Sequence, residues 1–515
     1  MRYRLPAIPL SIVALLLFVA CGGSSRHRVQ SLEDVQEWVR PEYAIESEAV
    51  YNEIGQQVAS QPVRMYADSY TRQYYQTAQP LVWATRMGIS NQADTLLTWM
   101  EKADDLGLSP EVFQVDTIRA LLQQARSYDF STTNNSELTG RLEYLLTRAY
   151  LRYACGQRYG FIVPRQVFNH LLTDSPGGEG KATVYRRIYD HQSEEATDSF
   201  VHIAIDRVRR HQLSGFLQEI QPTDTLYRQM QSEYRRAKAQ GDTIRQRLAR
   251  INMERARWRY PHPTTGKYVF VNLAEQELTA VDTGRDTVMT MRVCCGSASH
   301  KTPLLHSEIR WTELNPYWVI PQSIVSKEIM PRHVGDSAYY ARNRYHAVDK
   351  NTHEIVNPSA LSAAQLRSGQ YTLRQEKGAG NSLGRIIFRF PNSFSVYLHD
   401  TNNRSAFQYA NRAISHGCVR VERPLDLAVF LLDHPDAFFV DRIRMAIDLS
   451  PLSEQGKRYK AAHPDAKPMS RFDYPSPIPV WLDYWTLYPT PGGTLVTHPD
   501  NYGYDKVIDK ILLSY

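Results

Sequence analysis

The spacing of apolar residues divides the chain into a helical first part and a strand-rich second part. Through residues 64–255 the apolar positions recur every three or four residues, as in the stretch 96–103, and this period is typical of amphipathic helices. Beyond Pro261 the period falls to two, beginning with the run 267–272, which predicts β-strands. We therefore expect an α+β fold in which a helical N-terminal region precedes a mostly β domain.

Breaks in this pattern predict the domain boundaries. The expected units are a signal peptide at 1–21, a linker with a first helix at 22–60, a helical domain at 61–258 with a glycine-rich loop at 174–182, and a β domain at 259–515 with a long insertion at 322–380. Near the C-terminus we expect a polar, weakly structured extension at 452–475, a hairpin formed by 480–485 and 493–496, and a closing helix at 505–513.

The first residues have the features of an export signal. Arg2 and Arg4 precede an apolar run at 9–20 that is too short to span a bilayer, which takes about 18 residues. The segment ending at Cys21 resembles a bacterial lipobox, which implies cleavage before Cys21 and lipidation of its sulfur; an ordinary secretory signal is the alternative. We expect a periplasmic protein anchored to a bacterial membrane, with the outer membrane favoured, although the residues after Cys21 do not identify the membrane.

Charge excludes one class of partner. The net charge of +6 over 515 residues is small, and no basic run with interleaved aromatic residues occurs, so we expect no nucleic-acid binding. The arginine-dense stretch 245–257 is expected to be a solvated helix face rather than a contact with an anionic polymer.

The five cysteines have different expected roles. Cys155 lies in a helical apolar pattern and is expected to be a buried core thiol. Cys294 and Cys295 are adjacent in a predicted strand, so their side chains point to opposite faces and cannot easily share a disulfide or a metal. No CxxC pair occurs, so we expect neither a metal site nor a cofactor. With Cys21 assigned to lipidation, Cys418 remains for chemistry.

The stretch 415–420, Ser-His-Gly-Cys-Val-Arg, carries the residues best suited to catalysis. Cys418 directly follows Gly417, and two imidazoles precede it, those of His416 and, further upstream, His399. A thiol becomes a strong nucleophile when a neighbouring base or positive charge favours its thiolate. Gly417 allows a sharp turn, so the N–H groups of Gly417 and Cys418 are expected to face a developing oxyanion.

The order of histidine, spacer, Ser-His-Gly-Cys and arginine resembles the L,D-transpeptidase catalytic domain of the YkuD type. Segments 81–83, 106–110 and 158–160 resemble the scaffold domain of the large periplasmic branch of that family. The resemblance implies a scaffold domain at 61–258 and a catalytic domain at 259–515 whose insertion 322–380 caps the active site. That branch usually carries a peptidoglycan-binding module between the two domains, for which this chain has too few residues.

The resemblance also implies roles for single residues. Cys418 would attack the carbonyl between the third and fourth residues of a peptidoglycan stem peptide, releasing D-alanine and forming a thioester, and His399 would act as the base. Asp400 would either orient His399, through its backbone or its side chain, or only cap the following turn. His416 would tune the thiol, contact substrate or brace the loop, and Ser415 would hold the loop.

Three further residues are expected to bind substrate. Tyr397 lies two positions before His399 and therefore on the same strand face, where it would line the donor pocket. Arg420 would bind a stem carboxylate, with a structural ion pair to Glu422 or Asp426 as the alternative. Asn381, before the strands that lead to His399, is also assigned to substrate.

The predicted function is an L,D-transpeptidase of cell-wall biogenesis and cell shape that crosslinks third-position stem residues. An L,D-carboxypeptidase, an enzyme attaching a protein to peptidoglycan and a non-catalytic cell-wall scaffold are the alternatives. The expected partners are peptidoglycan stem peptides, the membrane through lipid on Cys21, and proteins of cell-wall synthesis. The resemblance also implies that carbapenems acylate Cys418.

Overall fold

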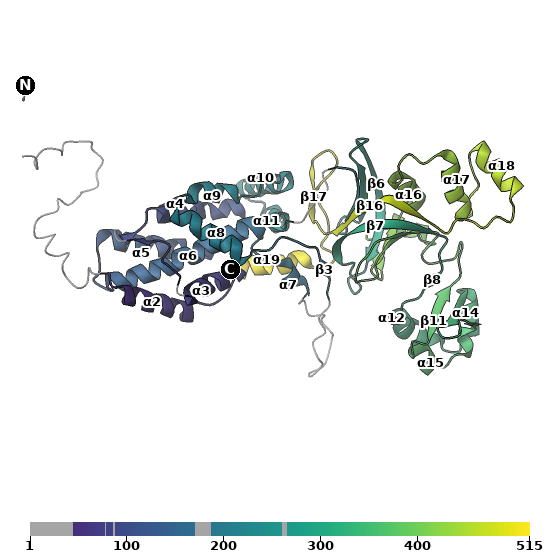
Figure 1. Cartoon of the computed structure of the whole chain (residues 1–515), viewed down its shortest axis with the longest axis horizontal. Coiled ribbons are helices and arrows are strands. Elements are labelled where there is room, and N and C mark those ends of the chain that lie inside the picture. The colour runs from purple at the N-terminus through teal and green to yellow at the C-terminus, as the bar shows by residue number, and fades with distance from the viewer. Residues whose placement is uncertain (1–44, 78, 86–87, 170–186, 260–264, 515) are drawn as a thin grey trace, which may run out of the picture.

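The computed structural model describes residues 45–77, 79–85, 88–169, 187–259 and 265–514, in a helical region, a β region and a small subdomain (Figure 1). The predicted lipidation site Cys21 and the loop 174–182 lie outside these residues. Within them, every helix is too short or too polar to span a membrane. The α+β class predicted from the sequence is confirmed.

The helical region is built around α6 (Asn135–Tyr159), which is buried along most of its length. The Asn134 side chain accepts a hydrogen bond from the Glu137 N–H and so caps the start of this helix. The other elements of the region are α2 (Ser47–Ser60), α3 (Tyr66–Gln76), β1 (Ala84–Thr85), β2 (Gly88–Ile89), α4 (Gln92–Met100), η2 (Glu101–Leu106), η3 (Pro110–Phe113), α5 (Val115–Ser127), α7 (Pro164–Asn169), α8 (Asp198–Arg209), α9 (Leu213–Glu219), α10 (Thr225–Gln240) and α11 (Thr243–Arg257).

The β region is a ten-stranded sheet that closes on itself. Its strands follow the order β12-β13-β15-β6-β5-β4-β16-β7-β3, with β14 beside β6, and an additional pairing of β12 with β7 closes the sheet into a barrel. The strands are β3 (Tyr189–Asp190), β4 (Lys267–Asn272), β5 (Glu277–Asp282), β6 (Thr287–Gly296), β7 (Leu304–Leu314), β12 (Ile386–Arg389), β13 (Leu398–His399), β14 (Ala413–Ser415), β15 (Val419–Val421) and β16 (Arg471–Asp483).

Side chains alternate between the barrel interior and its outer surface. Leu398 and Val419, which are partners across β13 and β15, are fully buried in the interior. Their chain neighbours therefore point outward. The other elements of this region are η6 (Arg404–Gln408), α16 (Pro424–Leu431), α17 (Ala437–Ala446), α18 (Glu454–Ala462), β17 (Leu487–Pro489), β18 (Leu495–Thr497) and α19 (Tyr504–Ser514).

Residues 318–375, which we call the insertion subdomain, form a separate unit between β7 and β12 (Figure 1). A four-stranded sheet and several short helices enclose their own apolar core. The elements are β8 (Trp318–Val319), α12 (Gln322–Ile324), the π-helical η4 (Val325–Ile329), α13 (Met330–His333), α14 (Ser337–Arg342), β9 (Tyr345–Asp349), β10 (Ile355–Val356), η5 (Pro358–Ala360), α15 (Ala363–Arg367) and β11 (Tyr371–Gln375).

Two predictions near the C-terminus are wrong. The stretch 452–475 contains the helix α18 and the start of β16. The stretch 480–485 forms no hairpin with 493–496; instead β16 lies between β4 and β7 in the barrel, and the hairpin is β17–β18. Period two predicts a strand but not its partner, because partners far apart in sequence leave no local signal.

The arginine-dense helix α11 is not a solvated face. Arg255 and Arg257 are almost fully buried, and Arg255 forms an ion pair of 2.7 Å with Asp505 of α19. Arg247 also pairs with α19, at Asp509. The closing helix therefore packs against the helical region, as Figure 1 shows, and joins it to the barrel.

A buried cluster of ion pairs contributes to the stability of the helical region. Arg148 and Arg152 of α6 both donate to the Asp68 carboxylate, which is 1% exposed. Burial acts to raise the pKa of Asp68, but these hydrogen bonds hold it well below its usual range. We predict that Asp68→Asn lowers the free energy of unfolding by about 3–5 kcal/mol, measured by urea denaturation, because it leaves buried guanidinium charge uncompensated.

The control is Asp116→Asn, since Asp116 is largely exposed and pairs with Arg119 at the surface. A carboxyl whose folded pKa is depressed stabilises the fold above its unfolded pKa, so the wild type should lose this stability as pH falls below about 4. Equal stability of Asp68→Asn and the control would contradict the account.

Candidate active site

Parallel pairing of β13 with β15 assembles the site. Leu398 lies opposite Val419, and His399 lies opposite Arg420. Because the partners Leu398 and Val419 point into the barrel, His399, Arg420 and Cys418 share its outer face. The structure thus brings the predicted nucleophile and the predicted base onto adjacent strands.

The loop that carries Cys418 is fixed by hydrogen bonds around Gly417. The Ser415 hydroxyl donates to the Cys418 carbonyl at 2.6 Å and accepts from the Gly417 N–H at 3.1 Å. The Thr302 hydroxyl donates to the Gly417 carbonyl at 2.8 Å. Gly417 has a φ of 122°, a conformation that side chains disfavour.

This geometry corrects one expectation about the oxyanion. The Gly417 N–H is already bonded to Ser415, so it does not point at a substrate. In the described part of the chain the N–H of Cys418 has no acceptor, which leaves this amide as the better oxyanion donor.

The Cys418 thiol is held in its protonated form. Its Sγ lies 3.8 Å from the carbonyl oxygen of Ser395, in the direction of a weak S–H hydrogen bond. Burial raises the pKa of the Cys418 thiol, and a backbone hydrogen bond from Tyr397 and the charges of Arg389 and Arg420 oppose this only in part.

His399 is held neutral. Burial and then the charge of Arg420 lower the pKa of His399 to about 4, against the opposing effect of backbone hydrogen bonds with Asp400 and Leu383. The Nδ1 atom lies 3.4 Å from the Leu383 carbonyl oxygen. A neutral imidazole on the same face of the paired strands as a neutral thiol is suited to general-base catalysis at neutral pH.

Arg420 is a cation without a partner. Its guanidinium has no hydrogen bond or ion pair among the residues described, and its Nε is buried. The alternative of an ion pair with Glu422 or Asp426 is wrong, because Glu422 pairs with Arg292 and Asp426 with Arg423. The guanidinium beside His399 is therefore available to an anionic group of a ligand.

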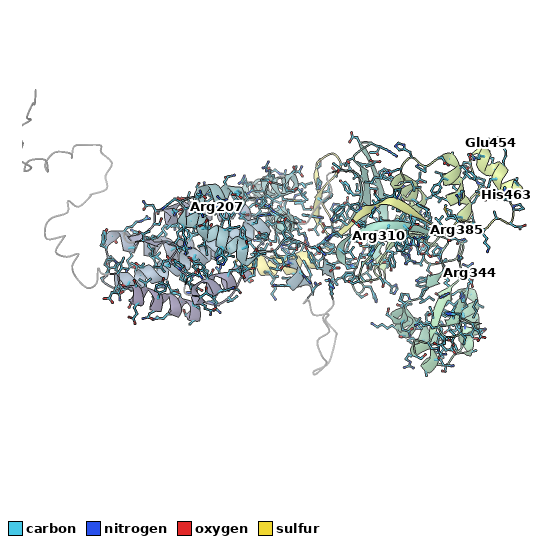
Figure 2. The ribbon with its side chains drawn as sticks, viewed as in Figure 1. Arg207, Arg310, Arg344, Arg385, Glu454 and His463 are labelled. Atoms are coloured by element: carbon cyan, nitrogen blue, oxygen red, sulfur yellow. The ribbon has the colours of Figure 1, made fainter. Side chains whose placement is uncertain are left out.

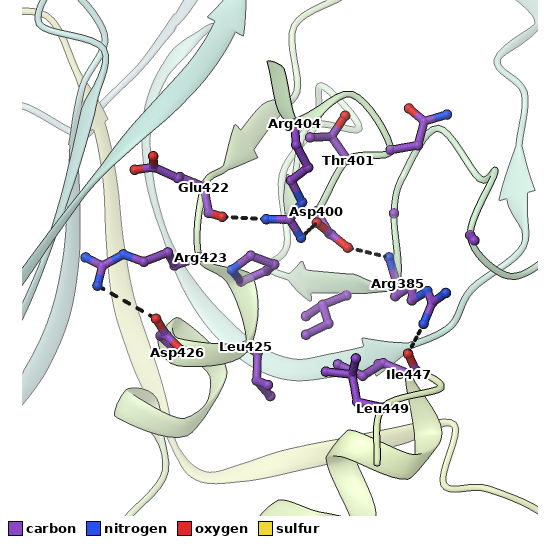
Figure 3. Close-up of a pocket in the computed structure, with 15 residues that line it drawn as sticks. Arg385, Asp400, Thr401, Arg404, Glu422, Arg423, Leu425, Asp426, Ile447 and Leu449 are labelled. Atoms are coloured by element: carbon purple, nitrogen blue, oxygen red, sulfur yellow. Dashed lines mark hydrogen bonds and ion pairs between the residues drawn. The ribbon is translucent and has the colours of Figure 1, made fainter. Parts of the chain in front are cut away.

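The Asp400 side chain does not orient His399. Its carboxylate accepts from the backbone N–H of Arg385 at 2.9 Å and from Arg404 at 2.7 Å (Figure 3). Gly384 packs so closely on Asp400 that a Cβ there would lie 2.4 Å from the Asp400 Cβ. Asp400 thereby fixes the turn that presents the Leu383 carbonyl to His399. Asp400 also lines a cavity of about 510 Å³. Neither Cys418 nor His399 lines this cavity, so it is separate from the candidate active site.

Asn381 is not placed to bind substrate. It is fully buried, and its side-chain amide donates to the carbonyls of Pro316 and Glu376 while accepting from the Leu383 N–H. The assignment to substrate is corrected, since these bonds tie together the two connections of the insertion subdomain. Arg344, which is labelled in Figure 2, donates to the carbonyls of Glu376 and Lys377 and so holds the second of these connections.

Tyr397 and His416 lie at the edges of the site. The Tyr397 ring is half-buried on the outer face and lies 4.4 Å from the Arg389 guanidinium. The Nε2 of His416 lies 2.7 Å from an oxygen of Glu328, in η4 of the insertion subdomain, and its ring lies 4.8 Å from that of His300. His416 thus links the nucleophile loop to the insertion subdomain.

Sequence reasoning missed the turn that holds the thiol. The Asn392 side chain accepts from the N–H groups of Phe394 and Val396 and donates to the Phe390 and Val396 carbonyls. These bonds hold Ser395 at a φ of 56°, which is unusual for a side-chain residue. The one available signal was Pro391-Asn392, a turn-forming pair, but nothing local connects it to Cys418.

The described residues contain no group of three or more histidine, cysteine, aspartate or glutamate side chains placed to hold an ion. Cys155, Cys294 and Cys295 are fully buried.

The fold and the site define a β-barrel domain that presents a cysteine and a histidine on neighbouring outer strands, behind a helical domain. Residues 266–440 match the model of the L,D-transpeptidase catalytic domain (YkuD), and residues 68–233 match the scaffold domain. A Haemophilus influenzae protein named "Putative L,D-transpeptidase" is 29% identical over 322 residues, which cover 62% of this chain and 60% of that protein. The chain therefore carries a YkuD-type L,D-transpeptidase catalytic domain together with a scaffold domain, as its motif predicted.

The charge of Arg420 provides a direct test of the electrostatics. We predict that Arg420→Met raises the pKa of His399 from about 4 towards its ordinary value, as measured by NMR titration of the His399 ring. The matched control is Arg310→Met, because Arg310 is a half-exposed barrel arginine that faces Glu308 and should leave His399 unchanged. A His399 pKa that stays at about 4 in Arg420→Met would show that Arg420 has no part in holding the imidazole neutral.

Proposed function

We propose that this protein is a peptidoglycan L,D-transpeptidase that works through a thioester on Cys418. The single observation that carries the proposal is the placement of the Cys418 thiol and the neutral His399 imidazole on one outer face of paired strands. The YkuD match supports the substrate class, because members of this family act on peptidoglycan stems.

In the first half-reaction His399 takes the proton of Cys418 as the sulfur attacks the carbonyl carbon between the third and fourth stem residues. The oxyanion that forms accepts a hydrogen bond from the backbone N–H of Cys418. The C–N bond then breaks, and the imidazolium of His399 returns its proton to the departing amine, which leaves as D-alanine. The product is a thioester on Cys418.

In the second half-reaction the side-chain amine of another stem attacks the thioester. His399 removes a proton from this amine, the C–S bond breaks, and the proton passes to the sulfur as Cys418 is regenerated. Arg420 binds a stem carboxylate, which supports the proposal because its guanidinium lacks an internal partner. Each half-reaction begins from neutral groups, so the base is available at neutral pH.

The insertion subdomain is proposed to cover the bound stems. Its contact with the nucleophile loop through Glu328 and His416 supports this role. Exclusion of water by such a cover would favour the amine over hydrolysis as the second step. An anchor through lipid on Cys21 and a periplasmic location remain proposals from the sequence.

The test is turnover of a disaccharide-tetrapeptide by full-length protein, with products separated by chromatography and identified by mass. We predict a crosslinked dimer and free D-alanine with the wild type, and a loss of product to background with Cys418→Ala, because the other described thiols, those of Cys155, Cys294 and Cys295, are fully buried.

The matched control is Cys155→Ala, which removes a buried thiol from α6 and should retain dimer formation. Tripeptide without dimer would replace the proposal by an L,D-carboxypeptidase. Product from Cys418→Ala at the wild-type rate would exclude the proposed nucleophile.

A further inference from the structure

A second cavity lies where the helical region meets the barrel, away from Cys418. Its volume is about 770 Å³, which is within the range of ligand sites. One wall comes from the start of α10 and the end of α11, the other from β17, and the floor is the outer face of β4, β5 and β6. We call this cavity the junction cleft.

Aromatic rings form the centre of the junction cleft. Phe270 of β4 and Tyr488 of β17 stack with centroids 5.4 Å apart and an angle of 19° between their planes. The ring centroid of Trp485 lies 6.0 Å from that of Tyr488. Tyr268 lies two residues before Phe270 on β4 and extends the row of rings. Phe270, Tyr488 and Tyr268 are only partly buried, so ring surface remains open to the cleft. Open ring faces suit a ligand with an apolar face, such as the C–H face of a pyranose.

Polar groups without internal partners line the same cleft. In the described part of the chain the hydroxyls of Tyr268, Tyr488 and Thr279 form no hydrogen bond, and the Glu277 carboxylate forms neither a hydrogen bond nor an ion pair. Burial, and then the neighbouring charge of Glu275, raise the pKa of Glu277. These groups can donate to and accept from hydroxyl and amide groups of a ligand.

The charges favour a neutral ligand. Arg255 is buried and paired with Asp505, so it offers no free cation. Asp224 caps α10 by accepting from two backbone N–H groups. The carboxyl groups of Glu275 and Glu277 disfavour an anion and offset the charge of Arg259, the other lining arginine. Stacking surface with uncharged hydrogen-bonding groups is the chemistry that recognises neutral sugars.

We propose that the junction cleft binds the N-acetylated glycan strand of peptidoglycan. The proposal rests on the proposed function, which makes peptidoglycan the substrate. β6 runs from Val288, at the cleft, to Gly296, next to the nucleophile loop, so both sites lie along one strand of the barrel. A glycan held at the cleft raises the local concentration of its own stems near Cys418.

The test is calorimetric titration of full-length Cys418→Ala protein with the β-1,4-linked tetramer of N-acetylglucosamine, a neutral probe. We predict that adding Tyr488→Ala weakens binding at least tenfold, because it removes the ring stacked on Phe270. Tyr488→Phe keeps the stacked ring and should bind within about threefold of the parent. The matched control is Tyr51→Ala, since Tyr51 is an exposed tyrosine of α2 and its loss should leave binding unchanged.

Glu277→Gln, which changes a partly exposed side chain, provides a second variant should Tyr488→Ala fail to fold; it should weaken binding at least threefold. Absence of sugar binding by the parent, or equal binding by the parent, Tyr488→Ala and Glu277→Gln, would overturn the proposal. So would displacement of the sugar by a free stem peptide, which would make the cleft a peptide site. These results are independent of turnover at Cys418, so failure of the glycan site and failure of the transpeptidase proposal are distinguishable.

Discussion

The hydrogen-bonded register between β13 and β15 is the constraint on which the site depends. Leu398 and Val419 anchor this register in the barrel core, and it places His399 and Cys418 together outside. A slip of one residue would turn His399 into the core and the apolar Leu398 to the surface, at a large cost in buried apolar area. β13 also pairs with β12 on its other side, so a shift would break hydrogen bonds with both neighbouring strands. The geometry of the candidate site is thus a consequence of core packing.

The parts of the account that were predictable depend on local sequence. The change of apolar period located the helical and β regions, and the Ser-His-Gly-Cys stretch with its upstream histidine located Cys418 and His399. The pairing of β13, which ends at His399, with β15, which begins directly after Cys418, brings these two residues to one face of the sheet. The loop that holds Cys418 is also local, since Ser415 bonds within three residues of itself.

The parts that were not predictable depend on contacts between distant segments. Pairing of β16 with β4 and packing of α19 on α11 join segments more than 200 residues apart, and no local pattern encodes them. Arg247, Arg250 and Arg255 of α11 looked solvated because their acidic partners, Asp505 and Asp509, lie near the C-terminus. Asn381 looked available because its burial is decided by the connections of the insertion subdomain.

The electrostatics of the site define the chemistry that it can perform. Burial keeps the Cys418 thiol protonated, and burial together with the charge of Arg420 keeps the His399 imidazole unprotonated. Attack by the sulfur of Cys418 therefore requires transfer of the thiol proton.

The measurement that tests this account most directly is trapping of the acylated protein by acid quench after mixing with a stem tetrapeptide, followed by peptide mapping. The account predicts one added tripeptide acyl group, on Cys418, with loss of D-alanine. An acyl group mapped to another residue, or crosslinked product without any acyl-protein, would contradict it.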